Sequence, residues 1–70
     1  MRRVEYIPEY SMEVLFSSNH IECYDLISKK VVCSRSYRER IANVKKVTFN
    51  CFLIYNKRNE LIDDICIDLA

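Results

Sequence analysis

Glycine is absent from this 70-residue chain, and proline occurs once, at position 8. Phosphate-binding loops, nucleophile elbows and dinucleotide-binding turns all depend on glycine, because the backbone there turns tightly or approaches its ligand closely. The sequence therefore excludes these classes of site. A chain of this length is expected to form a single small domain over residues 1–70, with little room for a deep substrate cleft beside its core.

The composition is typical of a folded protein, since hydrophobic residues make up 50% of the chain and charged residues 30%. It is too apolar for a disordered tail and too charged for a membrane span. No run of about 18 apolar residues occurs, and the first residues, Met-Arg-Arg-Val-Glu-Tyr, lack the apolar stretch of a signal peptide. We therefore expect a cytoplasmic protein with no membrane contact.

Charge is segregated along the chain although the formal net charge is only +1. The net charge is −3 over residues 1–27, +6 over residues 28–46 and −2 over residues 47–70. The basic middle segment is suited to phosphates or to an acidic protein surface, and it is equally typical of a solvated face. Its candidate contacts to nucleic acid or to an acidic partner are Arg35, Tyr37, Arg38, Arg40, Lys45 and Lys46.

The last third of the chain has the clearest strand pattern. Residues 47–55 are rich in aromatic and β-branched side chains, and the polar run Asn56-Lys57-Arg58-Asn59 then ends the pattern. We expect a four-residue loop with Asn59 near the left-handed region, and a returning strand with a bulge at Asp63-Asp64. That register buries one face, in the pairs Leu53 with Ile62, Cys51 with Ile65, Phe49 with Ile67 and Val47 with Leu69.

The first third predicts another hairpin. Tyr10, Met12, Val14 and Phe16 share one parity before the turn residues 17–19, and Ile21, Cys23 and Ile27 share a parity after them, although Asp25 interrupts it. The polar residues 28–30 then separate this hairpin from a third strand around residues 31–33, so that the sheet continues as a meander.

Residues 35–46 predict one short helix between the third and fourth strands. Ser36 and Glu39 match a capping box, and Tyr37, Ile41 and Val44 recur at helical spacing. The expected fold class is therefore α+β and β-rich. It consists of one antiparallel sheet of about four to five short strands, in two hairpins, with one short helix, and the sheet is either open or curled into a small barrel.

The four cysteines and the single histidine do not form a recognisable reactive site. The cysteines are 10, 18 and 15 positions apart, without the close pairs that structural zinc sites use. We expect free thiols, with Cys23 and Cys51 in the core. His20 beside a turn is more typical of a solvated side chain than of a catalytic base. The sequence thus predicts no enzyme, no cofactor and no small-molecule substrate.

The C-terminal hairpin also has a second apolar face, formed by Phe52, Ile54 and Leu61. A chain this small is not expected to cover both faces, so we expect these three residues to form a protein interface. The predicted function is a small interaction module, an adaptor or an inhibitor of the kind that phages use against host enzymes, with an apolar strand face and a basic rim. It binds a partner protein or a second copy of itself; the alternative is nucleic-acid binding by residues 35–46.

Overall fold

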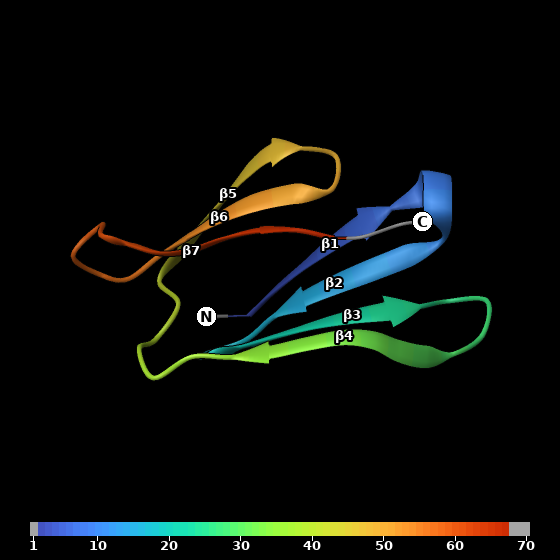
Figure 1. Ribbon diagram of the computed structural model, residues 1–70, viewed down its shortest axis with the longest axis horizontal. Helices are drawn as coiled ribbons and strands as arrows, with labels where there is room; N and C mark the ends of the chain where they lie inside the picture. The colour runs from blue at the N-terminus through green and yellow to red at the C-terminus, as the bar shows by residue number, and fades with distance from the viewer. Residues whose placement is uncertain (1, 68–70) are drawn as a thin grey trace.

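The computed structural model describes residues 2–67, and within this range the chain forms two antiparallel sheets. The first has the order β1-β2-β3-β4 and the second the order β5-β6-β7, so every pair of hydrogen-bonded strands is consecutive in sequence (Figure 1). The elements are β1 (Arg3–Ile7), the 3₁₀ turn η1 (Pro8–Tyr10), β2 (Met12–Phe16), β3 (His20–Asp25), β4 (Lys30–Ser36), β5 (Asn43–Thr48), β6 (Cys51–Tyr55) and β7 (Leu61–Cys66).

The prediction of a β-rich antiparallel fold is confirmed, but its finer details are wrong. The strands form two sheets instead of one sheet or a closed barrel, and within residues 2–67 there are seven of them. The expected helix over residues 35–46 is instead the end of β4, a connection that bends at residues 38–39, and most of β5. A two-turn helix has little stability of its own. Here the backbone N–H groups of Tyr37 and Ile41 donate to the carbonyl oxygens of Asn19 and Ser18 instead.

The first sheet follows the sequence pattern closely. Met12, Val14 and Phe16 on β2 and Ile21 and Cys23 on β3 are all buried, as predicted. Tyr10 in η1 and Ile27 in the turn after β3, which share that parity, are exposed. The turn at residues 17–19 and the third strand of the meander are confirmed as well. Strict alternation on one face was enough to predict which side of this sheet faces the core.

In the second sheet, β6 buries the face opposite to the expected one, whereas Ile65 on β7 and Ile67 just after it are buried as predicted. Phe52 pairs with Ile65 and Cys51 with Cys66, one residue away from the expected register, and the extra residue of the bulge is Ile62 instead of a residue at Asp63-Asp64. Because side chains alternate between the two faces of a strand, a slip of one residue exchanges the faces. Val47, the extra residue of a bulge on β5, and Phe49, in the turn between β5 and β6, are exposed. The expected pair Val47 with Leu69 lies outside the described residues.

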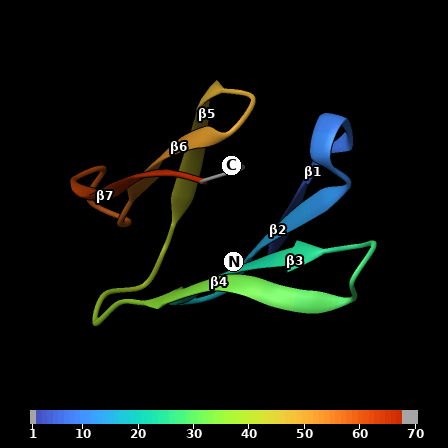
Figure 2. The same cartoon turned by 45° about the vertical axis from the view of Figure 1, so that its right-hand side comes forward.

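The two sheets face each other across a common core (Figures 1 and 2). The rings of Phe16 on β2 and Phe52 on β6 meet edge to face, with centroids 5.3 Å apart. At one side Arg3 of β1 donates through Nη1 to the Val44 carbonyl oxygen of β5 over 2.7 Å. At the other side Arg35 of β4 bonds Asp63 of β7. β1 thus lies beside β5, and β4 beside β7.

Three positions take a left-handed backbone conformation without glycine: Ser11 (φ 50°), Lys29 (φ 60°) and Asn59 (φ 63°). Ser11 follows η1, Lys29 ends the turn between β3 and β4, and Asn59 ends the turn between β6 and β7. The prediction for Asn59 is confirmed. Asparagine is among the few residues that adopt this conformation readily, whereas lysine is not.

The expectation of four free thiols is wrong for one pair. Cys51 and Cys66 lie directly opposite each other on β6 and β7 and form a disulfide, while Cys23 and Cys33 are free. Cys23 is fully buried as expected, but Cys51 is on the outer face of its sheet and only partly buried. Among residues 2–67, no helix is long and apolar enough to cross a membrane.

Candidate functional site

The three residues expected to form an interface do not share one face. Phe52 and Ile54 are 1% and 0% exposed between the sheets, whereas Leu61 is 56% exposed on the outer face of β7. The exchange of faces on β6 is the physical reason, since it places Phe52 and Ile54 in the core while Leu61 on β7 keeps its expected outer position. The prediction of an exposed interface formed by Phe52 and Ile54 is therefore wrong, and any binding surface must lie elsewhere on the protein.

The basic segment does not form one continuous surface either. Arg35 and Tyr37 are held beside β7 by Asp63, while Nζ of Lys46 lies 3.9 Å from Oε2 of Glu5 on β1. These two contacts are on opposite sides of the fold, because β4 adjoins β7 and β1 adjoins β5. The remaining candidates, Arg38, Arg40 and Lys45, are exposed.

Asp63 forms a polar link between the sheets on the side where β4 adjoins β7. Its Oδ2 accepts from Nη1 of Arg35 at 2.8 Å and from the Tyr37 hydroxyl at 2.7 Å. Burial acts to raise the pKa of the Asp63 carboxyl, but the Tyr37 hydrogen bond and the Arg35 guanidinium hold it below its usual value. Burial and the Asp63 charge raise the pKa of Tyr37. Two of the expected nucleic-acid contacts are therefore occupied within the protein.

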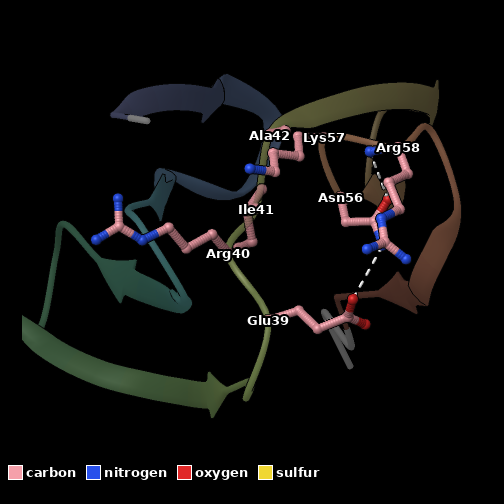
Figure 3. Close-up of a pocket in the computed structure, with 7 residues that line it drawn as sticks. All are labelled: Glu39, Arg40, Ile41, Ala42, Asn56, Lys57 and Arg58. Carbon is pink, nitrogen blue, oxygen red and sulfur yellow. Dashed lines mark hydrogen bonds between the residues drawn. The ribbon is translucent and has the colours of Figure 1, made fainter.

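A hollow of about 470 Å³ lies at one end of the fold, between the connection from β4 to β5 and the turn from β6 to β7 (Figure 3). The Asn56 side chain builds the turn, because its Oδ1 accepts from the backbone N–H groups of Arg58 and Glu60. Its Nδ2 donates to Oε1 of Glu39 across the hollow at 2.9 Å. The lining residues are Glu39, Arg40, Ile41, Ala42, Asn56, Lys57 and Arg58.

This hollow brings together cations that the sequence did not associate. Lys57 and Arg58 were predicted only as turn residues, and the structure places them along the same hollow as Arg40 from the basic segment, whose guanidinium extends to the other side of the connection (Figure 3). The one carboxylate in the lining, Glu39, is hydrogen-bonded to Asn56, and it points away from Arg40 on the opposite side of the connection (Figure 3). The turn signal at residues 56–59 was visible in the sequence, but its proximity to Arg40 depends on tertiary folding.

The edge strands differ in how well they are protected against pairing with another chain. Charged residues lie within β1 (Arg3 and Glu5), β5 (Lys45 and Lys46) and β7 (Asp63 and Asp64), and such charges discourage further strand pairing. On β4 the charges lie near the ends, at Lys30 and Arg35, and the central residues 31–34 are uncharged. We call residues 30–36 the β4 edge.

The β4 edge is long and accessible. Among the described residues, β4 is hydrogen-bonded to a strand on one side only, and six of its seven residues are exposed. The large apolar side chains Val31 and Val32 are 47% and 54% exposed at its centre. Such a strand offers a row of free backbone N–H and C=O groups together with apolar contact area.

The β4 edge continues into the outer face of the first sheet. Val31 lies opposite Tyr24 on β3, Tyr24 opposite Glu13 on β2, and Glu13 opposite Tyr6 on β1. Tyr6 and Tyr24 are exposed, and the Tyr24 hydroxyl donates to the Lys29 carbonyl oxygen, which fixes its ring next to the edge. A segment bound along β4 would therefore contact aromatic surface as well as backbone.

A polar cluster around His20 superficially resembles a nucleophilic arrangement. Nδ1 of His20 lies 2.8 Å from Oγ of Ser36, and Nε2 lies 3.3 Å from Oε1 of Glu22. These side chains stand on the outer surface of neighbouring strands, where water competes for each bond, so the cluster lacks the enclosure that catalysis by such groups needs. Within residues 2–67, no three His, Cys, Asp or Glu side chains converge as metal ligands would.

Comparison with known proteins gives no relative from which a function could be transferred. No family model matches the chain, and neither the curated proteins nor the solved structures include a detectably similar one. The function therefore has to be inferred from the surfaces of the protein itself.

Proposed function

We propose that this protein is a small, non-enzymatic protein-interaction module that binds an extended segment of a partner along the β4 edge. The observation that supports this is the contrast among the edge strands: only the β4 edge combines exposed apolar side chains with an uncharged centre in the part of the chain described. Addition of a strand to such an edge gives affinity through main-chain hydrogen bonds and specificity through alternate side chains. An adaptor or an inhibitor works in this way.

The charge around the β4 edge indicates the chemistry of the partner. Lys29, Lys30, Arg35 and Arg38 are exposed at its two ends; Arg35 is paired with Asp63, but 54% of its side chain remains exposed. Two copies of β4 paired antiparallel about their centres would bring Lys30 of each near Arg35 of the other, and like charges facing each other destabilise strand pairing. The proposed partner is therefore a different protein that offers an extended segment with an apolar centre and acidic flanks.

The test uses two valines that differ only in their strand. Val32 and Val47 are 54% and 55% exposed, and each is the extra residue of a bulge on an edge strand, β4 and β5 respectively. We expect Val32→Asp to abolish binding of a peptide with a valine-rich centre and glutamate flanks, and Val47→Asp to leave it unchanged. Amide chemical shifts of the parent protein should change along β4 on titration.

The outcomes of this test are distinct. A peptide with lysine flanks should bind at least about tenfold more weakly, because its charges face Lys30 and Arg35. If shifts concentrate on β5 or β7, or if both aspartate variants bind like the parent, the β4 edge is not the docking site. A protein captured from cell extract supports the proposal only when Val32→Asp loses it and Val47→Asp keeps it.

Nucleic-acid binding is a second candidate because of the hollow that joins Arg40, Lys57 and Arg58. Three phosphates neutralised there would give a slope of about −2 to −3 in log affinity against log salt concentration. We expect Arg40→Ala with Lys57→Ala to reduce this slope. Lys29→Ala with Lys30→Ala removes the same charge from the turn between β3 and β4 and serves as the control. Absence of oligonucleotide binding at about 50 mM salt would eliminate this candidate.

A further inference from the structure

The four cysteines form two pairs, one in each sheet, and both pairs have the same relation to their strands. Cys51 faces Cys66 across β6 and β7, and Cys23 faces Cys33 across β3 and β4, each as directly opposite residues of an antiparallel ladder. The first pair is a disulfide and the second pair is two thiols. Nothing in the sequence spacing distinguishes a bonded pair from a free one, so the relation appears only in the folded chain.

Cys23 and Cys33 are direct cross-strand neighbours, because they lie opposite each other on β3 and β4. Opposite residues of an antiparallel pair have Cβ atoms about 4.5–5.5 Å apart, close to the roughly 3.5–4.5 Å that a disulfide needs. The ladder shifts register immediately beside the pair, with Val32 as the extra residue, so β4 can adjust locally without moving the rest of the sheet.

Access to the pair is one-sided. Cys23 is fully buried on the inner face of β3, whereas Cys33 is partly exposed on the edge strand β4. Burial, together with Cys33, raises the pKa of the Cys23 thiol to about 12. A soluble reagent therefore meets Cys33 first, and Cys23 can act only after its neighbour has reacted.

We propose that Cys23 and Cys33 are a reversible dithiol–disulfide couple whose oxidant is a low-molecular-weight disulfide entering through Cys33. The Cys33 thiolate attacks one sulfur of the oxidant, forms a mixed disulfide and releases one thiol. Cys23 then gives up its proton and attacks the Cys33 sulfur, which releases the second thiol and leaves the Cys23–Cys33 bond. The oxidant disulfide is thus reduced to two thiols while the protein dithiol is oxidised.

The bond has a consequence for the edge strand beside it. A disulfide at Cys33 would tie the centre of β4 to β3 next to the bulge, in the way that Cys51–Cys66 ties β6 to β7. The couple goes beyond the proposed function and does not depend on it, because it needs only the β3–β4 ladder. Its failure and the failure of partner binding are therefore separate results.

The experiment uses the intact parent protein and glutathione disulfide. After incubation, free thiols are alkylated, the chain is digested with trypsin and linked peptides are identified by mass. Cleavage after Lys29 and Lys30 puts Cys23 and Cys33 on separate peptides, and cleavage after Lys57 and Arg58 separates Cys51 from Cys66. We expect both linkages after oxidation, and the Cys23–Cys33 linkage should disappear in reduced glutathione.

Two variants test the order of events. Cys23→Ala should stop at a stable glutathione adduct on Cys33, and Cys33→Ser should leave Cys23 unmodified, with alkylation at least about tenfold slower than that of Cys33 in the parent. An adduct that persists on Cys33 in the parent, or a bond from Cys23 to Cys51 or Cys66, would overturn the proposal. If Cys23→Ala fails to fold, the peptide map of the parent alone decides the question.

Discussion

The two sheets bury their inner faces by different means. In the four-stranded sheet the buried residues on β2 and β3 alternate strictly with partly exposed polar or mixed residues. In the three-stranded sheet both faces are apolar: Phe52 and Ile54 face the core, while Leu53 and Tyr55 lie on the outer side with the Cys51–Cys66 disulfide. The sequence pattern of the smaller sheet therefore does not specify which face is buried, and this sheet also contains a disulfide.

This difference shows what determines the orientation of a strand. Alternation specifies the buried face only where the other face is polar, because a slip of one residue then exposes apolar side chains to water. Where both faces are apolar, the position of the bulge and the fit to the opposite sheet decide. Ile62 and the edge-to-face contact between Phe16 and Phe52 have this role here.

The largest expected effect tests which face of β6 is buried. Phe52→Ala should lower the free energy of unfolding by about 3–5 kcal/mol, as should Phe16→Ala on the opposite sheet, because each leaves a cavity in the common core. Phe49→Ala is the control, since Phe49 is 46% exposed and stacks only on Tyr10. Urea denaturation followed by circular dichroism measures all three. A larger loss for Phe49→Ala than for Phe52→Ala would restore the opposite register.

The second prediction asks how much the smaller sheet depends on its covalent link. Cys51→Ser with Cys66→Ser should cost about 3 kcal/mol, the chain-entropy value for a loop of this size, since the two cysteines are 15 positions apart. Cys33→Ser in the larger sheet should cost much less, because its partly exposed thiol closes no loop in the free state. Equal costs in thermal unfolding would show that the two sheets do not differ in this respect.

The third prediction concerns the polar link that Asp63 forms between the sheets. The pKa of Asp63 lies below its ordinary value of 3.8 in the folded protein. The resulting stabilisation is present above that pH and is lost as the pH falls through the lower folded value. Asp63→Asn should lower the free energy of unfolding at neutral pH by about 1 kcal/mol, because it weakens the hydrogen bonds to Arg35 and Tyr37. It should also reduce the loss of stability that the parent protein shows as the pH falls below about 4. Asp64→Asn, on an exposed neighbour, should change neither.

Much of this architecture was accessible from the sequence, and the failures have identifiable physical causes. The first sheet, its turns and the turn at Asn56–Asn59 were predictable from local alternation and turn chemistry. The helix prediction failed because Ile41 and Val44 fit a helical stripe and a strand entering the core equally well, and tertiary hydrogen bonds from Tyr37 and Ile41 decided the outcome. Local pattern does not contain that information.

The candidate site was less predictable than the fold. Residues 31–33 were expected to form a strand, but its place at an edge follows from the strand order, which periodicity does not reveal. The pairing of Cys51 with Cys66 and of Cys23 with Cys33 depends on register, and so does the burial of Phe52 and Ile54. The basic segment was visible in the sequence. The sequence did not show that its cations separate in the fold, with Arg35 paired with Asp63, Lys46 near Glu5 and Arg40 at the hollow.

The smallest expected effect compares one turn from each sheet. Lys29→Gly should stabilise the protein by up to about 1 kcal/mol, because a lysine side chain crowds the left-handed backbone at that position. Asn59→Gly should gain less or nothing, since asparagine tolerates this conformation. Differential scanning calorimetry can compare the two variants with the parent. A larger gain for Asn59→Gly would show that the turn of the smaller sheet is the more strained one.

The absence of glycine also acts on the chain before it folds. Fixing the backbone of a residue costs about 1–2 kcal/mol of conformational entropy, and glycine, with the widest range of backbone angles, loses the most. A glycine-free chain therefore starts from a narrower unfolded ensemble, and less of its small core is needed to offset the entropy of ordering. The strained turn at Lys29 is a local cost of a composition that favours folding everywhere else. Flexible glycine-rich loops grafted into this scaffold would remove that advantage even where they touch no other residue.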